Sequence, residues 1–232
     1  MLKFNIHLSL DGFTLSARGS QTVHRVGLLG LAGAGKTLLL ECLAGLRRPG
    51  HGYITHHGRR LFDSAAALHA PIAYRHLAYV PPDGQLIPHM TVCENLLLVQ
   101  PRRNLRMMAE LLRVFRLGRV RNVMPDALSP AQCQAAALAR ALASCPRMIL
   151  LDDPLRQLDP SDRMETMALY KHAVTRWPVS FIYAGQNPDE VAHFTAACWK
   201  MSRGVLWHPT PAPEARIALP VESPEPAVAR AA

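Results

Sequence analysis

The sequence predicts an α/β fold with an antiparallel β-subdomain, a strand-loop-helix core and an inserted helical subdomain. Three patterns indicate this fold. Apolar and polar residues alternate over 2–17, which is typical of half-buried strands. A glycine-rich run at 30–37 lies between a buried strand and the start of a helix. Helical patterns occupy most of 88–145, and a continuous apolar strand at 148–151 follows them.

The first two strands are expected to form a hairpin. Residues 2–10 alternate, Asp11-Gly12 is a two-residue turn signal, and the alternation resumes over 13–17. Later elements are predicted by capping boxes, proline at first helical positions and glycine turns. They are strands near 53–54 and 77–80, helices begun by Thr91 with Glu94 and by Ser129-Pro130-Ala131-Gln132, a helix, a strand and a helix through about Phe194, and a hairpin around Arg203-Gly204.

The glycine-rich run has the pattern of a phosphate-binding loop. The pattern G-x-x-x-x-G-K-[ST] is satisfied by Gly30-Leu31-Ala32-Gly33-Ala34-Gly35-Lys36-Thr37. Glycines let the backbone N–H groups curl around phosphate. Lys36 supplies a charge for the outer phosphates, and the Thr37 hydroxyl can ligate Mg²⁺. Because a strand precedes the loop and a helix begins after it, we expect ATP or GTP to bind here.

Composition limits the class of protein. The chain has 232 residues, 49% of them hydrophobic, which suits either one substantial core or one domain with an inserted subdomain. No stretch reaches the ~18 uncharged apolar residues of a membrane helix. The N-terminal residues alternate instead of forming a secretory signal. Five cysteines are widely spaced without a C-x-x-C pair, so neither zinc nor disulfides are predicted. We therefore expect a cytosolic protein with reduced thiols.

The formal charge is +9, and part of it is concentrated in one amphipathic stretch. Arginines recur over 102–121 beside a single acid, Glu110, while apolar residues follow helical spacing. Two interpretations stay open: a solvated face over an apolar core, or a face near anionic lipid headgroups. Nucleic-acid binding is the weaker third interpretation because no interleaved aromatic residues or nucleic-acid motif accompany the arginines.

A second acidic motif completes the predicted site. The apolar strand at 148–151 ends in Asp152-Asp153, and a phosphate loop needs an acid of this kind to complete a magnesium shell. We expect this strand to lie beside the strand that precedes the phosphate loop. Asp152 would then reach the Mg²⁺ held by Thr37, and Asp153 would point toward the γ-phosphate.

With these motifs in place, the chain resembles the ATP-binding subunits of ABC transporters, most closely those of molybdate-type importers. The resemblance runs from about Met1 to Trp207. Besides the phosphate loop and 150–154, it rests on Ala44-Gly45-Leu46 with Pro49 and Gly52, Pro88-His89-Met90-Thr91-Val92 with Glu94-Asn95-Leu96, Leu128-Ser129 with Gln132, Ala139-Arg140-Ala141-Leu142, Leu158-Asp159 and Asp189-Glu190-Val191.

The resemblance implies an architecture and a set of partners. It implies a P-loop NTPase core of the RecA-like type within a nucleotide-binding domain at 1–207 and a helical subdomain at about 88–145. Beyond that domain, the repeated prolines predict a proline-rich, disordered tail at 208–232. Such subunits bind ATP and Mg²⁺ and form head-to-tail homodimers or heterodimers with another ATP-binding subunit. They act as ATPases beneath transmembrane permease subunits, on the inner face of the cytoplasmic membrane. No nucleic acid is expected as a partner, and molybdate or a related oxyanion is the implied cargo.

Several positions depart from the family's pattern. Pro82 stands where a magnesium-contacting glutamine is usual and cannot replace it. The signature segment reads Leu128-Ser129-Pro130-Ala131-Gln132. Through it, Ser129 and Gln132 are expected to contact the nucleotide of a partner, although Pro130 removes one backbone donor. The alternative interpretation is that this segment is only a well-capped helix start.

Two catalytic positions are also changed. Asp153 replaces the usual glutamate, so the carboxylate that orients water is one methylene shorter. Gln186 replaces the switch histidine and can donate a hydrogen bond to the γ-phosphate but cannot become cationic. Lys36, by contrast, is retained. Phe13 is a candidate for stacking on adenine, against the alternative of a core phenylalanine.

Two functions are therefore predicted from the sequence, and a soluble ABC protein without a permease is a weaker third interpretation. The first is an ABC-type ATPase subunit that couples slow hydrolysis to import. The second is a hydrolysis-impaired nucleotide-binding module that acts as the regulatory or structural half of a complex. Turnover that depends on Lys36 separates them.

Overall fold

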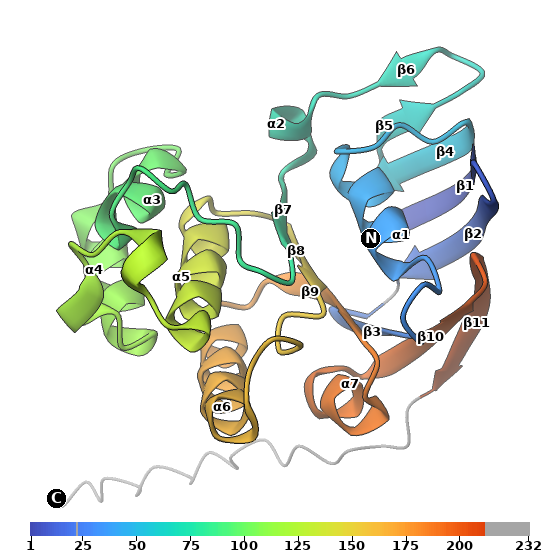
Figure 1. The fold of residues 1–232 in the computed structure, drawn as a ribbon. Helices are drawn as coiled ribbons and strands as arrows, with labels where there is room; N and C mark the ends of the chain where they lie inside the picture. The colour runs from blue at the N-terminus through green and yellow to red at the C-terminus, as the bar shows by residue number, and fades with distance from the viewer. Residues whose placement is uncertain (22, 212–232) are drawn as a thin grey trace, which may run out of the picture.

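The computed structural model describes residues 1–21 and 23–211, and within them it forms one eleven-stranded sheet flanked by helices (Figure 1). The strand order is β6-β5-β4-β1-β2-β11-β10-β3-β9-β8-β7. The strands are β1 (Leu2–Leu10), β2 (Phe13–Gln21), β3 (Arg25–Leu29), β4 (His51–His56), β5 (Arg59–Asp63), β6 (Leu68–His69), β7 (Leu77–Val80), β8 (Met148–Asp152), β9 (Ser180–Gly185), β10 (Ala197–Ser202) and β11 (Val205–Pro211).

One half of the sheet is mainly antiparallel, and its first hairpin is confirmed. β1 pairs with β2 from Leu2 opposite Gln21 to Leu10 opposite Phe13, so Asp11-Gly12 is the turn. β4 pairs with the other edge of β1, and β5 and β6 extend the sheet outward. The predicted hairpin around Arg203-Gly204 is also confirmed, as β10 and β11.

The other half is parallel and carries the phosphate loop. β10, β3, β9, β8 and β7 lie side by side in one direction. The expectation that β8 lies beside β3 is wrong, because β9 lies between them. All three strands nevertheless end at the same edge of the sheet, so residues that follow β8 and β9 still reach the loop after β3.

The helices begin where the local signals indicate. Thr91 and Glu94 form a capping box, and so do Ser129 and Gln132, as predicted. α3, α4 and α5 gather at one end of the molecule, within the segment 88–145 (Figure 1). The helices are α1 (Lys36–Ala44), α2 (Ile72–Arg75), α3 (Val92–Leu98), α4 (Leu105–Val114), α5 (Pro130–Ala143), α6 (Pro160–Arg176) and α7 (Pro188–Phe194), with 3-10 turns η1 (Gly118–Val120) and η2 (Pro125–Ala127).

Two hydrophobic clusters cover the two faces of the parallel strands. Alternate residues of β8 serve both: Met148 and Leu150 pack on α1, whereas Ile149 and Leu151 pack toward α5. We call these the β-side cluster and the helical-side cluster. The β-side cluster includes Leu2, Phe4, Leu28, Leu39, Leu43, Ile182 and Trp199, and the helical-side cluster includes Leu96, Leu111, Phe115, Leu138, Leu155, Tyr170 and Tyr183.

Two further observations concern the ends and the surface. β11 runs through Pro211, past the expected boundary at 207, and the rest of the predicted proline-rich tail lies outside the described residues. Among the described helices, none is both long enough and apolar enough to cross a bilayer. The arginine-rich stretch at 102–121 includes α4 and η1 with irregular segments around them, and its arginines are exposed.

Candidate functional site

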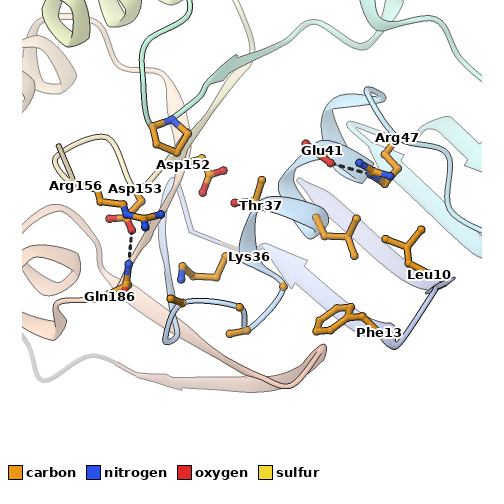
Figure 2. Close-up of a pocket in the computed structure, with 16 residues that line it drawn as sticks. Leu10, Phe13, Lys36, Thr37, Glu41, Arg47, Asp152, Asp153, Arg156 and Gln186 are labelled. Atoms are coloured by element: carbon orange, nitrogen blue, oxygen red, sulfur yellow. Dashed lines mark hydrogen bonds and ion pairs between the residues drawn. The ribbon is translucent and has the colours of Figure 1, made fainter. Parts of the chain in front are cut away.

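A cavity of about 390 Å³ opens at the edge where the parallel strands end (Figure 2). Its size lies within the ~300–1,000 Å³ typical of small-ligand sites. The loop after β3 forms its floor, and residues that follow β8 and β9 form one wall. The predicted site residues that line it are Phe13, Ala32, Gly33, Ala34, Gly35, Lys36, Thr37, Asp152, Asp153 and Gln186.

The phosphate loop adopts a conformation that depends on glycine. Gly33 and Gly35 have φ of 74° and 102°, in the left-handed region. Gly35 is the N-cap of α1, so the first N–H groups of this helix have no partner within it, and residues of its first turn line the cavity. The hairpin turn supports the loop from behind, because the Gly204 N–H donates to the Ala34 carbonyl at 2.9 Å. This arrangement suits an anionic ligand.

Lys36 folds back onto the loop. Its Nζ donates to the carbonyls of Gly30 at 2.8 Å and Leu31 at 3.0 Å. Burial lowers the pKa of Lys36 below its ordinary value, while the charges of Asp153 and Asp152 oppose that shift. The ammonium is therefore held inside the loop by neutral carbonyls, which a phosphate oxygen can replace as the stronger, charged acceptor.

Asp152 and Thr37 form an oxygen pair suited to Mg²⁺. Asp152 is 1% exposed and accepts hydrogen bonds from the Thr37 hydroxyl and, at 2.9 Å, from the Tyr79 hydroxyl. Burial raises the pKa of Asp152, and both hydrogen bonds lower it. Hard oxygen ligands of this kind, together with substrate phosphates, are what Mg²⁺ prefers. The residues present therefore fit a magnesium ion bound with nucleotide.

Asp153 and Gln186 contact each other across the cavity wall. Gln186 Nε2 donates to Asp153 Oδ2 at 2.9 Å, and the Asp153 N–H donates to the Ala184 carbonyl at 2.9 Å. Asp153 has φ of 46°, a left-handed conformation that aspartate and asparagine tolerate better than most residues. The aspartate at this position thus matches its backbone as well as its proposed chemistry.

Phe13 and Pro82 both line the cavity. The sequence left two roles open for Phe13, and Pro82 stands where the family usually has a glutamine. Phe13 is partly buried, packs against the β-side cluster and also lines the cavity, so the two interpretations of this ring do not exclude each other. Pro82 is likewise part of the lining. Its carbonyl accepts a hydrogen bond from Gln134 of α5, which ties the segment after β7 to the helical subdomain.

Other predicted site residues lie elsewhere. Gly30 and Leu31 line a neighbouring hollow of about 860 Å³ on the other side of the loop. Ser129 and Gln132 lie at the start of α5, outside the cavity, and their side chains are used in the capping box. Their contact with the nucleotide of a partner stays a prediction.

Some lining residues were not identified from the sequence. Arg156 belongs to the turn after β8, and no motif in the sequence marks it. Leu10 and the ion pair between Glu41 and Arg47, at 2.8 Å, line the end of the cavity near Phe13. A pair six residues apart across a helix end has no sequence signature, so structure alone reveals it.

Comparison with known proteins relates this geometry to a family. A family model described as ABC transporter matches residues 18–156. The molybdenum import ATP-binding protein ModC of Paramagnetospirillum magneticum is 31% identical over 195 residues, which are 82% of this chain and 54% of that protein. ModC of Methylococcus capsulatus is 32% identical over 226 residues, or 93% of this chain and 62% of that protein. The chain thus spans little more than half the length of these curated relatives.

The solved structures agree with the fold. A dimeric ATP-binding cassette, MJ0796, in a post-hydrolysis state with ADP and phosphate, superposes with a TM-score of 0.73 at 22% identity, covering 92% of this chain and all of that one. A likeness at this identity concerns the fold, which is that of a P-loop NTPase. The family model spans more than half of the chain and includes both the phosphate loop and Asp152-Asp153. The chain therefore belongs to the ABC transporter family and has the fold of its ATP-binding cassettes.

Proposed function

We propose that this protein is the ATP-binding subunit of an ABC importer and that it binds and hydrolyses MgATP in the cavity described above. The convergence of the phosphate loop, Asp152, Asp153 and Gln186 on one cavity carries this proposal. Lys36 and the loop N–H groups hold the phosphates, and Thr37 with Asp152 holds Mg²⁺. When bound, Mg²⁺ neutralises charge on the outer phosphates. Asp153 orients the attacking water, and Gln186 donates to the γ-phosphate.

The relatives support a cargo and partners. Because the similar proteins are named as molybdenum import ATP-binding proteins, we infer molybdate or a related oxyanion as the cargo. Transmembrane permease subunits and a second ATP-binding subunit, identical or different, are the corresponding partners. Such a subunit acts at the inner face of the cytoplasmic membrane. Ser129 and Gln132 would then face the nucleotide of the second subunit.

One observation favours a second candidate function. The Asp153 carboxylate already accepts a hydrogen bond from Gln186, and it is a methylene shorter than the glutamate usual in the family. A displacement of about 1 Å can slow catalysis about a hundredfold. A module that binds nucleotide but hydrolyses it slowly, beside a competent ATPase, is therefore the alternative.

Steady-state phosphate release tests the proposal. The full chain is compared with Lys36→Ala and Asp153→Asn, and nucleotide binding is followed in the same samples. Asparagine tolerates the left-handed backbone of residue 153, so this variant removes the carboxylate charge without straining the turn. We expect Lys36→Ala to lose binding and turnover, and Asp153→Asn to keep binding and lose turnover.

Each result has a defined meaning. Turnover by the wild type that both variants lack supports the ATPase. Tight binding with wild-type turnover no higher than that of Asp153→Asn supports the nucleotide-binding module instead. Absence of nucleotide binding by the wild type contradicts both functions.

A further inference from the structure

Arg156 is a cationic residue of the cavity to which the proposed function gives no role. It lines the cavity together with Lys36, Asp153 and Gln186, and it is exposed. Across residues 1–21 and 23–211, no carboxylate lies within ion-pair distance of its guanidinium. A guanidinium presents several donors suited to phosphate oxygens, so this side chain is available for an anionic ligand.

The backbone around Arg156 is held in place. The Arg156 N–H donates to the Asp153 carbonyl at 3.0 Å, which closes a tight turn after β8. On either side, Leu155 and Leu158 are buried in the helical-side cluster, at 0% and 5% exposure. Two anchored leucines therefore fix the turn, and the long arginine side chain between them remains at the cavity.

The position of Arg156 along the cavity indicates which part of a ligand it meets. In Figure 2, Phe13 and Leu10 lie at one end, while Arg156 and Gln186 lie at the other beside Asp153. Lys36 and Thr37 lie between these ends. A nucleotide with its base near Phe13 and its phosphates along the loop therefore directs its outermost phosphate toward Arg156.

The charges near Asp153 favour a second positive charge for an outer phosphate at this end of the cavity. Asp152 and Asp153 contribute two carboxylates, against which Lys36 alone provides one positive charge on the loop. Burial is the main cause that lowers the pKa of Lys36, the two aspartates raise it, and the charge of Arg156 lowers it further. Arg156 thus adds a positive charge at the end of the cavity where Gln186 can donate a hydrogen bond but supplies no charge.

We propose that Arg156 contacts the outermost phosphate of the bound nucleotide and thereby makes the site prefer a nucleoside triphosphate over a diphosphate. This inference rests on the proposed binding of MgATP. Arg156 lines the same cavity as Gln186 and supplies, from the same chain, the positive charge that the Gln186 amide lacks. A diphosphate leaves this end of the cavity empty and does not use the contact.

Equilibrium binding of MgATP and MgADP to the full chain tests the inference. The variants are Arg156→Ala, Arg156→Gln and Arg156→Lys. Arg119→Ala is the matched control, because Arg119 is an exposed arginine of η1 that does not line the cavity. Loss of a charge-assisted hydrogen bond corresponds to about a tenfold to hundredfold loss of affinity. We expect this loss for MgATP in the alanine and glutamine variants, a change of less than about twofold for MgADP, and partial recovery with lysine.

The preference for triphosphate separates this role from a structural one. If Arg156→Ala and Arg156→Gln weaken both nucleotides equally, or neither, the inference is overturned while the proposed nucleotide binding stands. If the wild type binds neither nucleotide, the proposed function fails and the inference fails with it. Lys36→Ala provides the contrast, because it is expected to weaken both nucleotides.

Discussion

Asp153 combines a backbone requirement with a chemical one. Its φ of 46° favours aspartate or asparagine, and its carboxylate accepts the Gln186 amide at 2.9 Å. Glutamate would extend further toward a γ-phosphate but is less suited to this backbone. The shorter acid is thus consistent with the turn that also presents Arg156, so the two residues are best understood together.

His56 is expected to make stability depend on pH. Its ring is 3% exposed, its Nε2 has no hydrogen-bond partner among the described residues, and burial lowers its pKa from 6.5 to about 4. Between these values the unfolded chain binds the proton that the folded chain excludes. The stability that the neutral, buried His56 ring allows is therefore fully present above pH 6.5 and is lost as the pH falls toward 4.

Urea unfolding at pH 7 and pH 5 measures this effect. As the pH falls across this interval, we expect the free energy of unfolding of the wild type to decrease by up to about 1.4 kcal/mol per pH unit more than that of His56→Gln, because glutamine does not titrate. The comparison removes the contributions of other histidines, which both proteins share. Parallel pH dependences of the two proteins would contradict the assignment.

At the scale of elements, α1 depends on a buried arginine at its C-terminus. Arg75 is 1% exposed, and its guanidinium donates to the carbonyls of Cys42 and Leu43 at 3.1 and 2.9 Å, as well as to Ala70. The Cys42 and Leu43 carbonyls belong to the last turn of α1, where the helix itself leaves acceptors without a partner. A positive charge there also favours the helix dipole.

Replacing Arg75 is therefore expected to destabilise α1, the helix that begins at the end of the phosphate loop. Arg75→Ala removes all three hydrogen bonds that this buried guanidinium donates, which lowers the free energy of unfolding by about 3 kcal/mol or more. Arg75→Lys keeps the charge with fewer donors, so its stability is expected to lie between those of the wild type and Arg75→Ala. Chemical denaturation measures both, with the exposed Arg147→Ala as a control. An alanine variant as stable as the wild type would show that these bonds contribute nothing net.

Local elements were predictable because their signals lie within a few residues. Asp11-Gly12 joins the first hairpin, and the boxes at Thr91 and Ser129 start helices, as the sequence predicts. The place of β9 between β3 and β8 was not, because both β8 and β9 are continuous apolar strands that fit either position. Strand order depends on how two faces pack, and no short motif records it.

At the scale of the whole molecule, the site lies at the edge where the parallel strands end, between elements of the two hydrophobic clusters. The phosphate loop and Phe13 belong to elements packed on the β-side cluster, whereas Asp153 and Arg156 follow β8 at the border of the helical-side cluster. The sequence identified the motif residues but not Arg156 or the Glu41–Arg47 pair, since their places depend on this meeting of distant segments. The assigned roles of the motif residues stay predictions.

A ligand in this cavity is therefore expected to stabilise the whole chain. MgATP bound there would contact residues from elements of both hydrophobic clusters, and a ligand at about 100 times its Kd adds about 2.7 kcal/mol to the folded state. For a chain of this size, that corresponds to a rise in Tm of about 5–10 °C. Thermal unfolding of wild type, Lys36→Ala and Phe13→Ala with increasing MgATP measures it.

We expect the wild type to show the full rise, Phe13→Ala a smaller one, and Lys36→Ala none at the same concentration. Because stabilisation by mass action grows with the logarithm of ligand concentration, the rise must continue beyond saturation of the site. A rise that stops at saturation, or one that Lys36→Ala shares, would mean that nucleotide acts somewhere other than the phosphate loop. The dependence on Lys36 thus connects global stability to this loop, and the dependence on Phe13 connects it to the opposite end of the cavity.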